Sequence, residues 1–277
     1  TGPQSGVEVQ WSFETRNTIR SSPAVVDNTV YIGSEDDYLY AVSANDGSER
    51  WSYETGSAGR SSPAVADGTV YVGGDKVYAM SADDGTQEWE HSLGTAVTAS
   101  PVVADGTVYI AGRGYSLHAL SATDGTERWE QSAGGVPLAP AVVNDSVYVE
   151  AKKLSVDDGT EQWESSDGSG PPTVVDDSIY LGGGTEVYAL SADDGTKRWS
   201  FETRYPNTSP AVVDGTVYVG SNNGKVYALS ADDGTERWSY DTGDATTAPT
   251  VIDGTVYVGS FRIGVFELSA ADGTEQW

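Results

Sequence analysis

The sequence has no cysteine, only two histidines and only five lysines. The lack of cysteine excludes disulfides, thiolate nucleophiles and cysteine-ligated zinc or iron–sulfur sites. No apolar run approaches the roughly 20 residues that span a bilayer. Because 15 Lys and Arg stand against 42 Asp and Glu, the formal net charge is −27. This balance excludes an ordinary nucleic-acid binder, which needs clustered cations to neutralise phosphates.

The acidity does not indicate disorder. The chain carries 8 Trp, 16 Tyr and 4 Phe, and its carboxylates are spread along the sequence rather than massed in a tail. So many aromatic residues are typical of a chain that buries a core. Acidic, lysine-poor surfaces resemble those of proteins from extreme halophiles, where the Debye length falls to about 3 Å at 1 M salt. We therefore expect a folded, halophilic protein.

Tryptophan marks an internal repeat. Consecutive tryptophans are 34 to 40 residues apart, and the motif covers the chain from its first tryptophan to its end. A period of this size is the signature of a repeat architecture. The positions are Trp11, Trp51, Trp89, Trp129, Trp163, Trp199, Trp238 and Trp277.

Each repeat predicts four short strands, A to D. In residues 210–238, Pro-Ala-Val-Val is strand A, Thr-Val-Tyr-Val-Gly strand B, Val-Tyr-Ala-Leu-Ser strand C, and Glu-Arg-Trp opens strand D. Asp-Gly pairs at 214–215 and 233–234 are strong hairpin signals, because glycine accepts positive φ without strain. Four antiparallel strands in about 40 residues make one blade of a β-propeller.

The repeat resembles a known family. Residues 79–89, Ala-Met-Ser-Ala-Asp-Asp-Gly-Thr-Gln-Glu-Trp, are similar to the tryptophan-docking motif of the pyrroloquinoline-quinone-type propeller repeat (Ala-x-Asp-x-x-Thr-Gly-x-x-x-Trp). Serine replaces the motif's Asp, as at Ser81, and aspartate replaces its Thr, as at Asp84. The family includes quinoprotein alcohol dehydrogenases and the propeller lipoprotein of the outer-membrane β-barrel assembly machine. The resemblance implies that each tryptophan docks between neighbouring blades.

The expected fold is an all-β, seven-bladed propeller forming a single domain over residues 1–277. The sequence has seven A–B–C units but eight tryptophan-bearing segments, so one terminal segment is redundant. We expect residues 7–14 to supply the closing strand, with residues 275–277 as the alternative. A truncated eight-bladed propeller is the rival fold. The repeats are 12–51, 52–89, 90–129, 130–163, 164–199, 200–238 and 239–277.

One repeat is irregular. Between Val147 and Ser155 the B–C connection has lost several residues, and Lys152-Lys153 stands where other repeats have Tyr-Ala. This predicts a shortened hairpin in the fourth blade.

The predicted strands sort the charges. The A–B and C–D turns hold 19 carboxylates, whereas ten basic residues lie in or beside the B–C and D–A connections. Loops on a rigid scaffold often carry function, although turn chemistry alone would also leave the cations there. Aromatic and basic residues of these loops are the candidates for a binding face: Arg20, Arg60, Arg113, Tyr115, Lys152, Tyr205, Phe261 and Arg262.

No catalytic or metal-binding motif emerges. His91 and His118 replace aromatic residues of the repeat, so we interpret them as substitutions rather than as a base or metal ligands. Asp-Asp-Gly-Thr lacks the alternating ligands of a calcium loop and is typical of a tight turn. The quinoprotein constellation of adjacent cysteines, calcium and an Asp base does not map onto this chain. Binding of pyrroloquinoline quinone or calcium is thus unsupported.

The leading hypothesis is a non-enzymatic scaffold that binds a protein partner, is extracellular or anchored at the cell surface, and does not bind nucleic acid. A quinone-dependent or other small-molecule oxidoreductase, with a site in the central funnel, is the second hypothesis. A structural surface-layer component is the third. A cytoplasmic location is the alternative to the cell surface.

Overall fold

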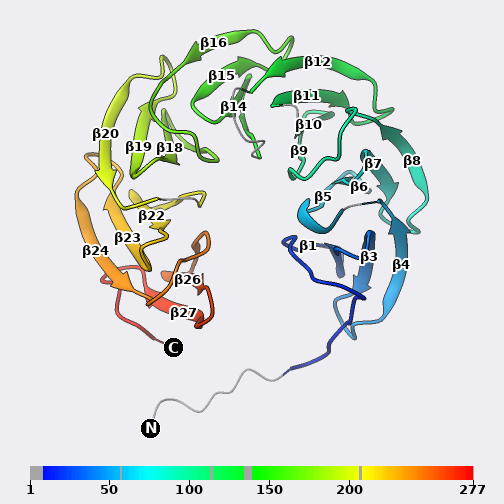
Figure 1. Cartoon of the computed structure of the whole chain (residues 1–277), viewed down its shortest axis with the longest axis horizontal. Coiled ribbons are helices and arrows are strands. Elements are labelled where there is room, and N and C mark those ends of the chain that lie inside the picture. The colour runs from blue at the N-terminus through cyan, green and yellow to red at the C-terminus, as the bar shows by residue number, and fades with distance from the viewer. Residues whose placement is uncertain (1–8, 57, 113–114, 134–138, 206–207, 277) are drawn as a thin grey trace. The chain divides into compact units, whose positions relative to one another are not determined.

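The structure is a computed structural model that describes residues 9–56, 58–112, 115–133, 139–205 and 208–276. The described residues contain 27 β-strands, one short 3-10 helix, η1 (Ala58–Arg60), and no α-helix. The chain divides into two compact units, Thr1–Ala139 and Pro140–Trp277. Figure 1 shows the strands of each sheet following one another along the chain.

The first unit contains three four-stranded antiparallel sheets, each in chain order. The first is β1 (Ala24–Val26), β2 (Thr29–Gly33), β3 (Tyr38–Ser43) and β4 (Glu49–Glu54). The second is β5 (Ala64–Ala66), β6 (Thr69–Gly73), β7 (Val77–Ser81) and β8 (Gln87–His91). The third is β9 (Val102–Ala104), β10 (Thr107–Ala111), β11 (Ser116–Ser121) and β12 (Glu127–Ser132).

The second unit contains three four-stranded sheets and one three-stranded sheet. The fourth sheet is β13 (Ala141–Val143), β14 (Ser146–Val149), β15 (Lys152–Ser155) and β16 (Glu161–Glu164). The fifth is β17 (Thr173–Val175), β18 (Ser178–Gly183), β19 (Glu186–Ser191) and β20 (Lys197–Glu202). The sixth is β21 (Ala211–Val213), β22 (Thr216–Gly220), β23 (Lys225–Ser230) and β24 (Glu236–Asp241), and the seventh is β25 (Thr250–Ile252), β26 (Thr255–Ser260) and β27 (Gly264–Ser269).

The predicted fold class, an all-β seven-bladed propeller, is confirmed: there is one antiparallel sheet for each predicted blade. The shortened hairpin of the fourth blade is also confirmed, because Val149 pairs with Lys152 across a two-residue turn. The A–B turns form as the Asp-Gly signal predicts. Asp214 and Gly215 both have positive φ, 48° and 66°, which suits the right-handed twist of a tight hairpin.

Either end of the chain could supply the fourth strand that closes the seventh sheet. Residues 9–14, the described part of the segment expected to close the last blade, are not in a strand. At the other end, Glu275 forms a bridge with Leu268, and the Gln276 N–H donates to the Glu267 carbonyl at 2.7 Å. The C-terminal segment therefore lies along β27, where a fourth strand would run. The assignment of residues 7–14 as the closing strand, like the repeat boundaries, stays a prediction.

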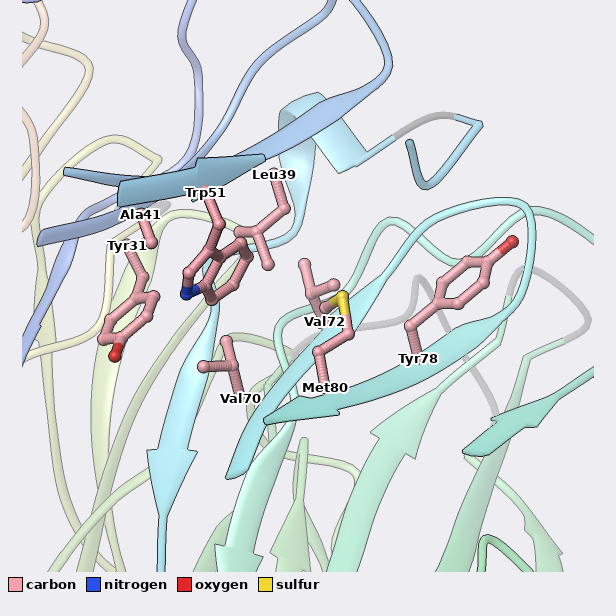
Figure 2. Close-up of a cluster of buried hydrophobic side chains, with 8 residues drawn as sticks. All are labelled: Tyr31, Leu39, Ala41, Trp51, Val70, Val72, Tyr78 and Met80. Atoms are coloured by element: carbon pink, nitrogen blue, oxygen red, sulfur yellow. The ribbon is translucent and has the colours of Figure 1, made fainter. Parts of the chain in front are cut away.

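The core of each unit lies between consecutive sheets. Val, Leu and aromatic side chains on the B and C strands of one sheet pack against those of the next, with a tryptophan from strand D between them. Figure 2 shows the cluster between the first two sheets, formed by Tyr31, Leu39, Ala41, Trp51, Val70, Val72, Tyr78 and Met80. Every sheet therefore needs its neighbour to bury its apolar faces.

A shared acceptor joins these sheets. The Trp51 Nε1–H and the Tyr31 hydroxyl both donate to the Ala82 carbonyl, at 3.0 and 3.2 Å. The indole of Trp51 lies so close to Gly85 that a Cβ there would be 2.6 Å from the ring. The same pair of donors recurs at the carbonyls of Ala122, Ala192, Ala231 and Ala270. Trp11 makes the equivalent indole bond, to the Ala44 carbonyl.

Candidate functional site

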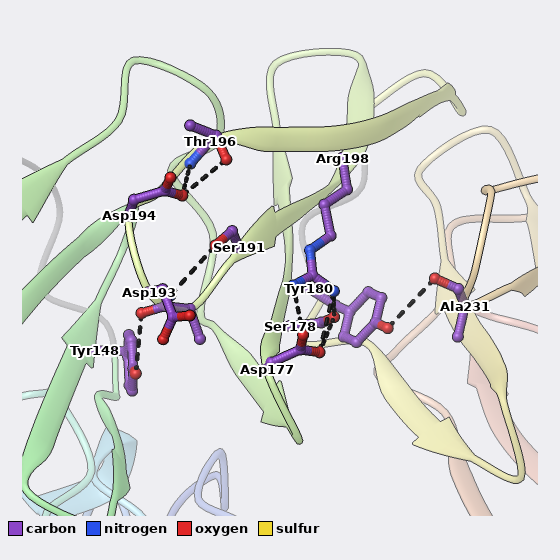
Figure 3. A network of polar contacts seen from close by, with 11 residues as sticks. Tyr148, Asp177, Ser178, Tyr180, Ser191, Asp193, Asp194, Thr196, Arg198 and Ala231 are labelled. Carbon is purple, nitrogen blue, oxygen red and sulfur yellow. Dashed lines mark hydrogen bonds and ion pairs between the residues drawn. The ribbon is translucent and has the colours of Figure 1, made fainter.

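The A–B and C–D turns occupy one end of each sheet, which we call the turn side. In every C–D turn an aspartate accepts hydrogen bonds from a threonine or serine two residues later. Asp233 Oδ1, for example, accepts from the Thr235 N–H at 3.1 Å and from its hydroxyl at 2.8 Å. These two bonds lower the pKa of the Asp233 carboxyl, with the hydroxyl bond as the larger cause. Figure 3 shows the equivalent turn at Asp194 and Thr196.

Two cavities on the turn side occupy the same place in different repeats. The larger, of about 470 Å³, is lined by Asp177, Tyr180 and Arg198 among others. The guanidinium of Arg198 binds both carboxylate oxygens of Asp177, at 3.0 and 2.8 Å (Figure 3). The second cavity, of about 340 Å³, contains Tyr31 and Arg50 at the matching positions. Because the cavities recur with the repeat, they follow from the architecture rather than from a dedicated ligand.

The B–C and D–A connections occupy the other end of each sheet, which we call the loop side. In the second unit these connections are hydrogen-bonded to one another. The Thr242 N–H donates to the Gly224 carbonyl at 2.7 Å, and the Phe261 N–H donates to the Ala245 carbonyl at 2.9 Å. The Asn222 N–H donates to the Tyr205 carbonyl at 3.3 Å. Backbone bonds therefore fix the path of these loops.

Several predicted binding residues are exposed on the loop side. In the second unit Tyr205 is 59% exposed and Phe261 is 65% exposed. Arg262 is exposed as well, and both Tyr205 and Arg262 have positive φ, 63° and 64°. In the first unit Tyr115 is exposed with φ 63°. Bulky residues with positive φ carry a conformational cost of about 1–2 kcal/mol, so the surrounding hydrogen bonds hold them there.

The structure adds one residue that the sequence analysis missed. Ile263, 55% exposed, follows Phe261 and Arg262 in the turn between β26 and β27. The three residues together form an apolar and basic hairpin tip. Their position in a B–C connection was the available signal, but an isoleucine next to a strand is more often a core residue.

Three of the predicted basic residues form ion pairs. Arg20 and Arg60 both lie beside Glu35, with Nε to Oε1 distances of 2.7 and 3.7 Å, so one carboxylate partly neutralises both. The Lys152 side chain is only 12% exposed and forms ion pairs with Glu161 and Glu164. Lys152 is thus poorly placed to contact a partner. Arg113 lies outside the described residues, and so does Trp277.

The histidines, interpreted separately from the sequence, lie close together. His118 Nδ1 is 2.9 Å from Glu127 Oε2, and His91 Nε2 is 3.8 Å from the same oxygen. Sequence reasoning missed this arrangement because the three residues come from two sheets and are up to 36 positions apart. The repeat could have predicted that the two histidines meet, because they replace the two members of one recurring aromatic pair.

The repeated sheets and their Trp–Ala contacts define a β-propeller built from pyrroloquinoline-quinone-type repeats. A family model described as outer membrane protein assembly factor BamB matches residues 3–92, 73–200 and 183–277. These overlapping matches cover nearly the whole chain, so the protein belongs to this family. No curated protein matches the sequence. Within the part of the chain that the structure describes, no helix is long and apolar enough to cross a membrane.

Solved structures share the fold at low sequence identity. BamB from Moraxella catarrhalis is 22% identical, with a TM-score of 0.76 over 93% of this chain and 84% of that one. A computationally designed protein, Ika8, is 14% identical, with a TM-score of 0.84 over 97% and 89%. Quinohemoprotein alcohol dehydrogenase from Comamonas testosteroni is 13% identical, with a TM-score of 0.80 over 96% and 67%. At these identities the likeness shows the fold alone.

Proposed function

We propose that this protein is a non-enzymatic scaffold that binds a protein partner through its loop side. The observation that carries the proposal is the set of exposed apolar side chains, Tyr205, Phe261 and Ile263, on loops fixed by backbone hydrogen bonds. Fixed loops lose little conformational entropy on binding. Membership of a family named for an assembly factor supports the same function.

The chemistry of the loop side favours a protein over other ligands. Aromatic and arginine side chains are the residues that most often carry the energy of protein interfaces. Phe261 and Ile263, with Arg262 between them, present an apolar surface with one positive charge. A polyanion would gain little from a chain whose net charge is −27.

The acidic turn side bears on the cellular location in which the protein works. We place the protein at the cell surface of a halophile, associated with an envelope assembly machine. Carboxylates held in repeated turns keep the protein soluble where salt screens their repulsion. In this proposal the turn side is a solvated coat and the loop side makes the contact.

Removing the exposed aromatics tests the proposal. A partner is first recovered with the wild-type protein from a detergent extract of the source cells in about 1 M salt, where the Debye length is ~3 Å. The affinity of the purified pair is then measured for wild type and for the Tyr205→Ser/Phe261→Ser double variant. Losing two interface aromatics should weaken binding by at least about tenfold.

Val213→Ser is the matched control. Val213 is also a partly exposed apolar residue of the second unit, but it ends β21 beside an Asp-Gly turn. This variant should bind like wild type. Equal affinity of the double variant and wild type would overturn the loop side as the binding surface, and equal weakening by both variants would indicate a general loss of folding.

A further inference from the structure

The two histidines and two glutamates of the first unit form a compact cluster. His118 Nδ1 lies 2.9 Å from Glu127 Oε2, and His118 Nε2 lies 3.9 Å from Glu130 Oε1. His91 Nε2 lies 3.8 Å from Glu127 Oε2. One potential ligand atom from each of His118, Glu127 and Glu130 lies within 4.8 Å of the others. His91 is not in this group of three, but it approaches the group at Glu127 and offers a second imidazole.

The backbone places these groups on one face of the third sheet. In the pairing of β11 with β12, His118 is opposite Glu130 and Leu120 is opposite Glu127, with a register shift between Ala119 and Leu120. Side chains two apart on a strand share a face, so His118 and Leu120 lie on one face of β11. Their cross-strand partners Glu130 and Glu127 project from that same face. His91 comes from the end of β8 in the second sheet.

A neighbouring junction shows what normally occupies this place. Between the first and second sheets, Tyr53 and Tyr78 pack with ring centroids 5.8 Å apart, and the Tyr53 hydroxyl donates to Gln87. His91 and His118 stand where Tyr53 and Tyr78 stand one repeat earlier. Both members of the aromatic pair have thus been replaced by imidazoles. Glu127, two residues before its tryptophan, takes the position of Gln87.

The fourth sheet shows how the same two carboxylates are balanced elsewhere. Lys152, at the position of His118, is paired in register with Glu164, which corresponds to Glu130. Its ammonium lies 3.2 Å from Glu164 Oε1 and 3.6 Å from Glu161 Oε2. A cation therefore occupies the site formed by this pair of carboxylates in one sheet. In the third sheet the corresponding side chain is an imidazole, a metal ligand.

We propose that His91, His118, Glu127 and Glu130 bind a divalent transition metal of the zinc type. Two imidazoles and two carboxylates suit tetrahedral Zn²⁺, whose ligand atoms at about 2.0–2.2 Å from the ion lie about 3.3–3.6 Å from one another. The two separations at Glu127 Oε2, 2.9 Å to His118 Nδ1 and 3.8 Å to His91 Nε2, bracket that range. Glu130 Oε1 lies 3.9 Å from the other imidazole nitrogen of His118, so the Glu130 side chain turns toward Nδ1 when the ion binds. Ca²⁺ and Mg²⁺ prefer all-oxygen sites, so the imidazoles select against them.

The metal would join two sheets. His91 belongs to the second sheet and the other three ligands to the third, so the ion spans a junction that elsewhere relies on aromatic packing. The His118 side chain is only 9% exposed, whereas Glu130 is half exposed. The ion would thus enter from the carboxylate side, and binding would stabilise the folded chain because the unfolded chain has no such site.

Zinc binding to the full-length chain tests the proposal. Binding is measured by equilibrium dialysis and by the rise in melting temperature, with excess Mg²⁺ present to occupy the acidic surface. Co²⁺ replaces Zn²⁺ in a parallel titration, because tetrahedral coordination by nitrogen and oxygen gives visible absorption bands. We expect one tight site, a higher melting temperature and tetrahedral cobalt bands.

Variants that copy the residues of the preceding junction keep the test independent of folding. The triple variant His91→Tyr/His118→Tyr/Glu127→Gln carries the residues of Tyr53, Tyr78 and Gln87, so it should fold without metal. It should lose the site, and His91→Tyr alone should weaken zinc binding by at least about tenfold. Glu90→Gln is the matched control, because Glu90 corresponds to Glu130 one repeat earlier but pairs with Lys76.

Each outcome decides the proposal. Loss of the tight site in the triple variant, with retention in Glu90→Gln, supports it. Unchanged zinc binding by the triple variant would assign the ion to the acidic surface and overturn the proposal. Unchanged binding by His91→Tyr, or no zinc-dependent rise in melting temperature in the wild type, would overturn it as well.

Discussion

The turn side and the loop side of the sheets differ in how tightly the backbone dictates their residues. In the C–D turns an aspartate, a positive-φ glycine and a threonine or serine recur because each meets a backbone requirement: Asp233 accepts two bonds, and Gly234 has φ 72° beneath Trp199. On the loop side, backbone bonds fix the path, but exposed residues such as Phe261 meet no such requirement. Side chains are therefore repeated where they build the fold and variable where they are free to bind.

The largest expected effect is at a turn-side tryptophan. Trp199 is buried, packs on Gly234 and donates to the Ala231 carbonyl. Trp199→Ala should lower the free energy of unfolding by about 3–5 kcal/mol. Tyr180→Phe, which removes only the second donor to Ala231, should cost about 1 kcal/mol. Denaturant unfolding measures both, and an equal cost would show that the indole contributes its hydrogen bond but not its packing.

Two glycines separate backbone strain from packing. Gly215 has φ 66° and open space where a Cβ would lie, whereas a Cβ on Gly234 would be 2.6 Å from the Trp199 ring. Gly215→Ala should cost about 1–2 kcal/mol for the left-handed conformation alone. Gly234→Ala should cost more, because the indole must also shift. Equal unfolding free energies for the two variants would contradict the packing role of this turn.

Acid should weaken the turns. The Thr235 hydroxyl and N–H hold the pKa of Asp233 below its ordinary value of 3.8. A pKa that is lower in the folded state gives stability that is present above the unfolded value and lost as the pH falls through the folded value. Asp233→Asn keeps an acceptor oxygen but does not titrate. The melting temperature of wild type should therefore exceed that of the variant at neutral pH, and the gap should close below about pH 3.8.

That comparison needs screened charges. In about 1 M salt the Debye length is ~3 Å, so protonating other carboxylates changes little repulsion. A gap between wild type and Asp233→Asn that persists at the lowest pH would contradict the titration of Asp233 as its cause.

The smallest expected effect on stability is on the loop side. Phe261 is 65% exposed, so Phe261→Ser should change the free energy of unfolding by less than about 0.5 kcal/mol. Denaturant unfolding alongside Trp199→Ala provides the check. A cost above about 1 kcal/mol, beyond the usual range for surface substitutions, would place Phe261 among the residues that build the fold and would remove the contrast between the two sides.

The sequence could predict the fold because its signals are local and repeated. The Asp-Gly pairs predict the hairpins, strand alternation predicts the buried faces, and the seven A–B–C units predict the number of sheets. The candidate binding residues stay a prediction, although the structure shows that Tyr205 and Phe261 are exposed and that Lys152 is held by Glu161 and Glu164. Those ion pairs depend on strand register across a bulge, which no local pattern encodes.

The sequence by itself determined that this chain folds into repeated four-stranded sheets, since turn chemistry and hydrophobic alternation act within about 40 residues. Only the tertiary structure decided which side chains meet across sheets. Trp51 reaches the carbonyl of Ala82, and His91 approaches the carboxylate that also contacts His118. Such contacts arise from packing one sheet on the next, where distances in space are set by the fold and not by separation along the chain.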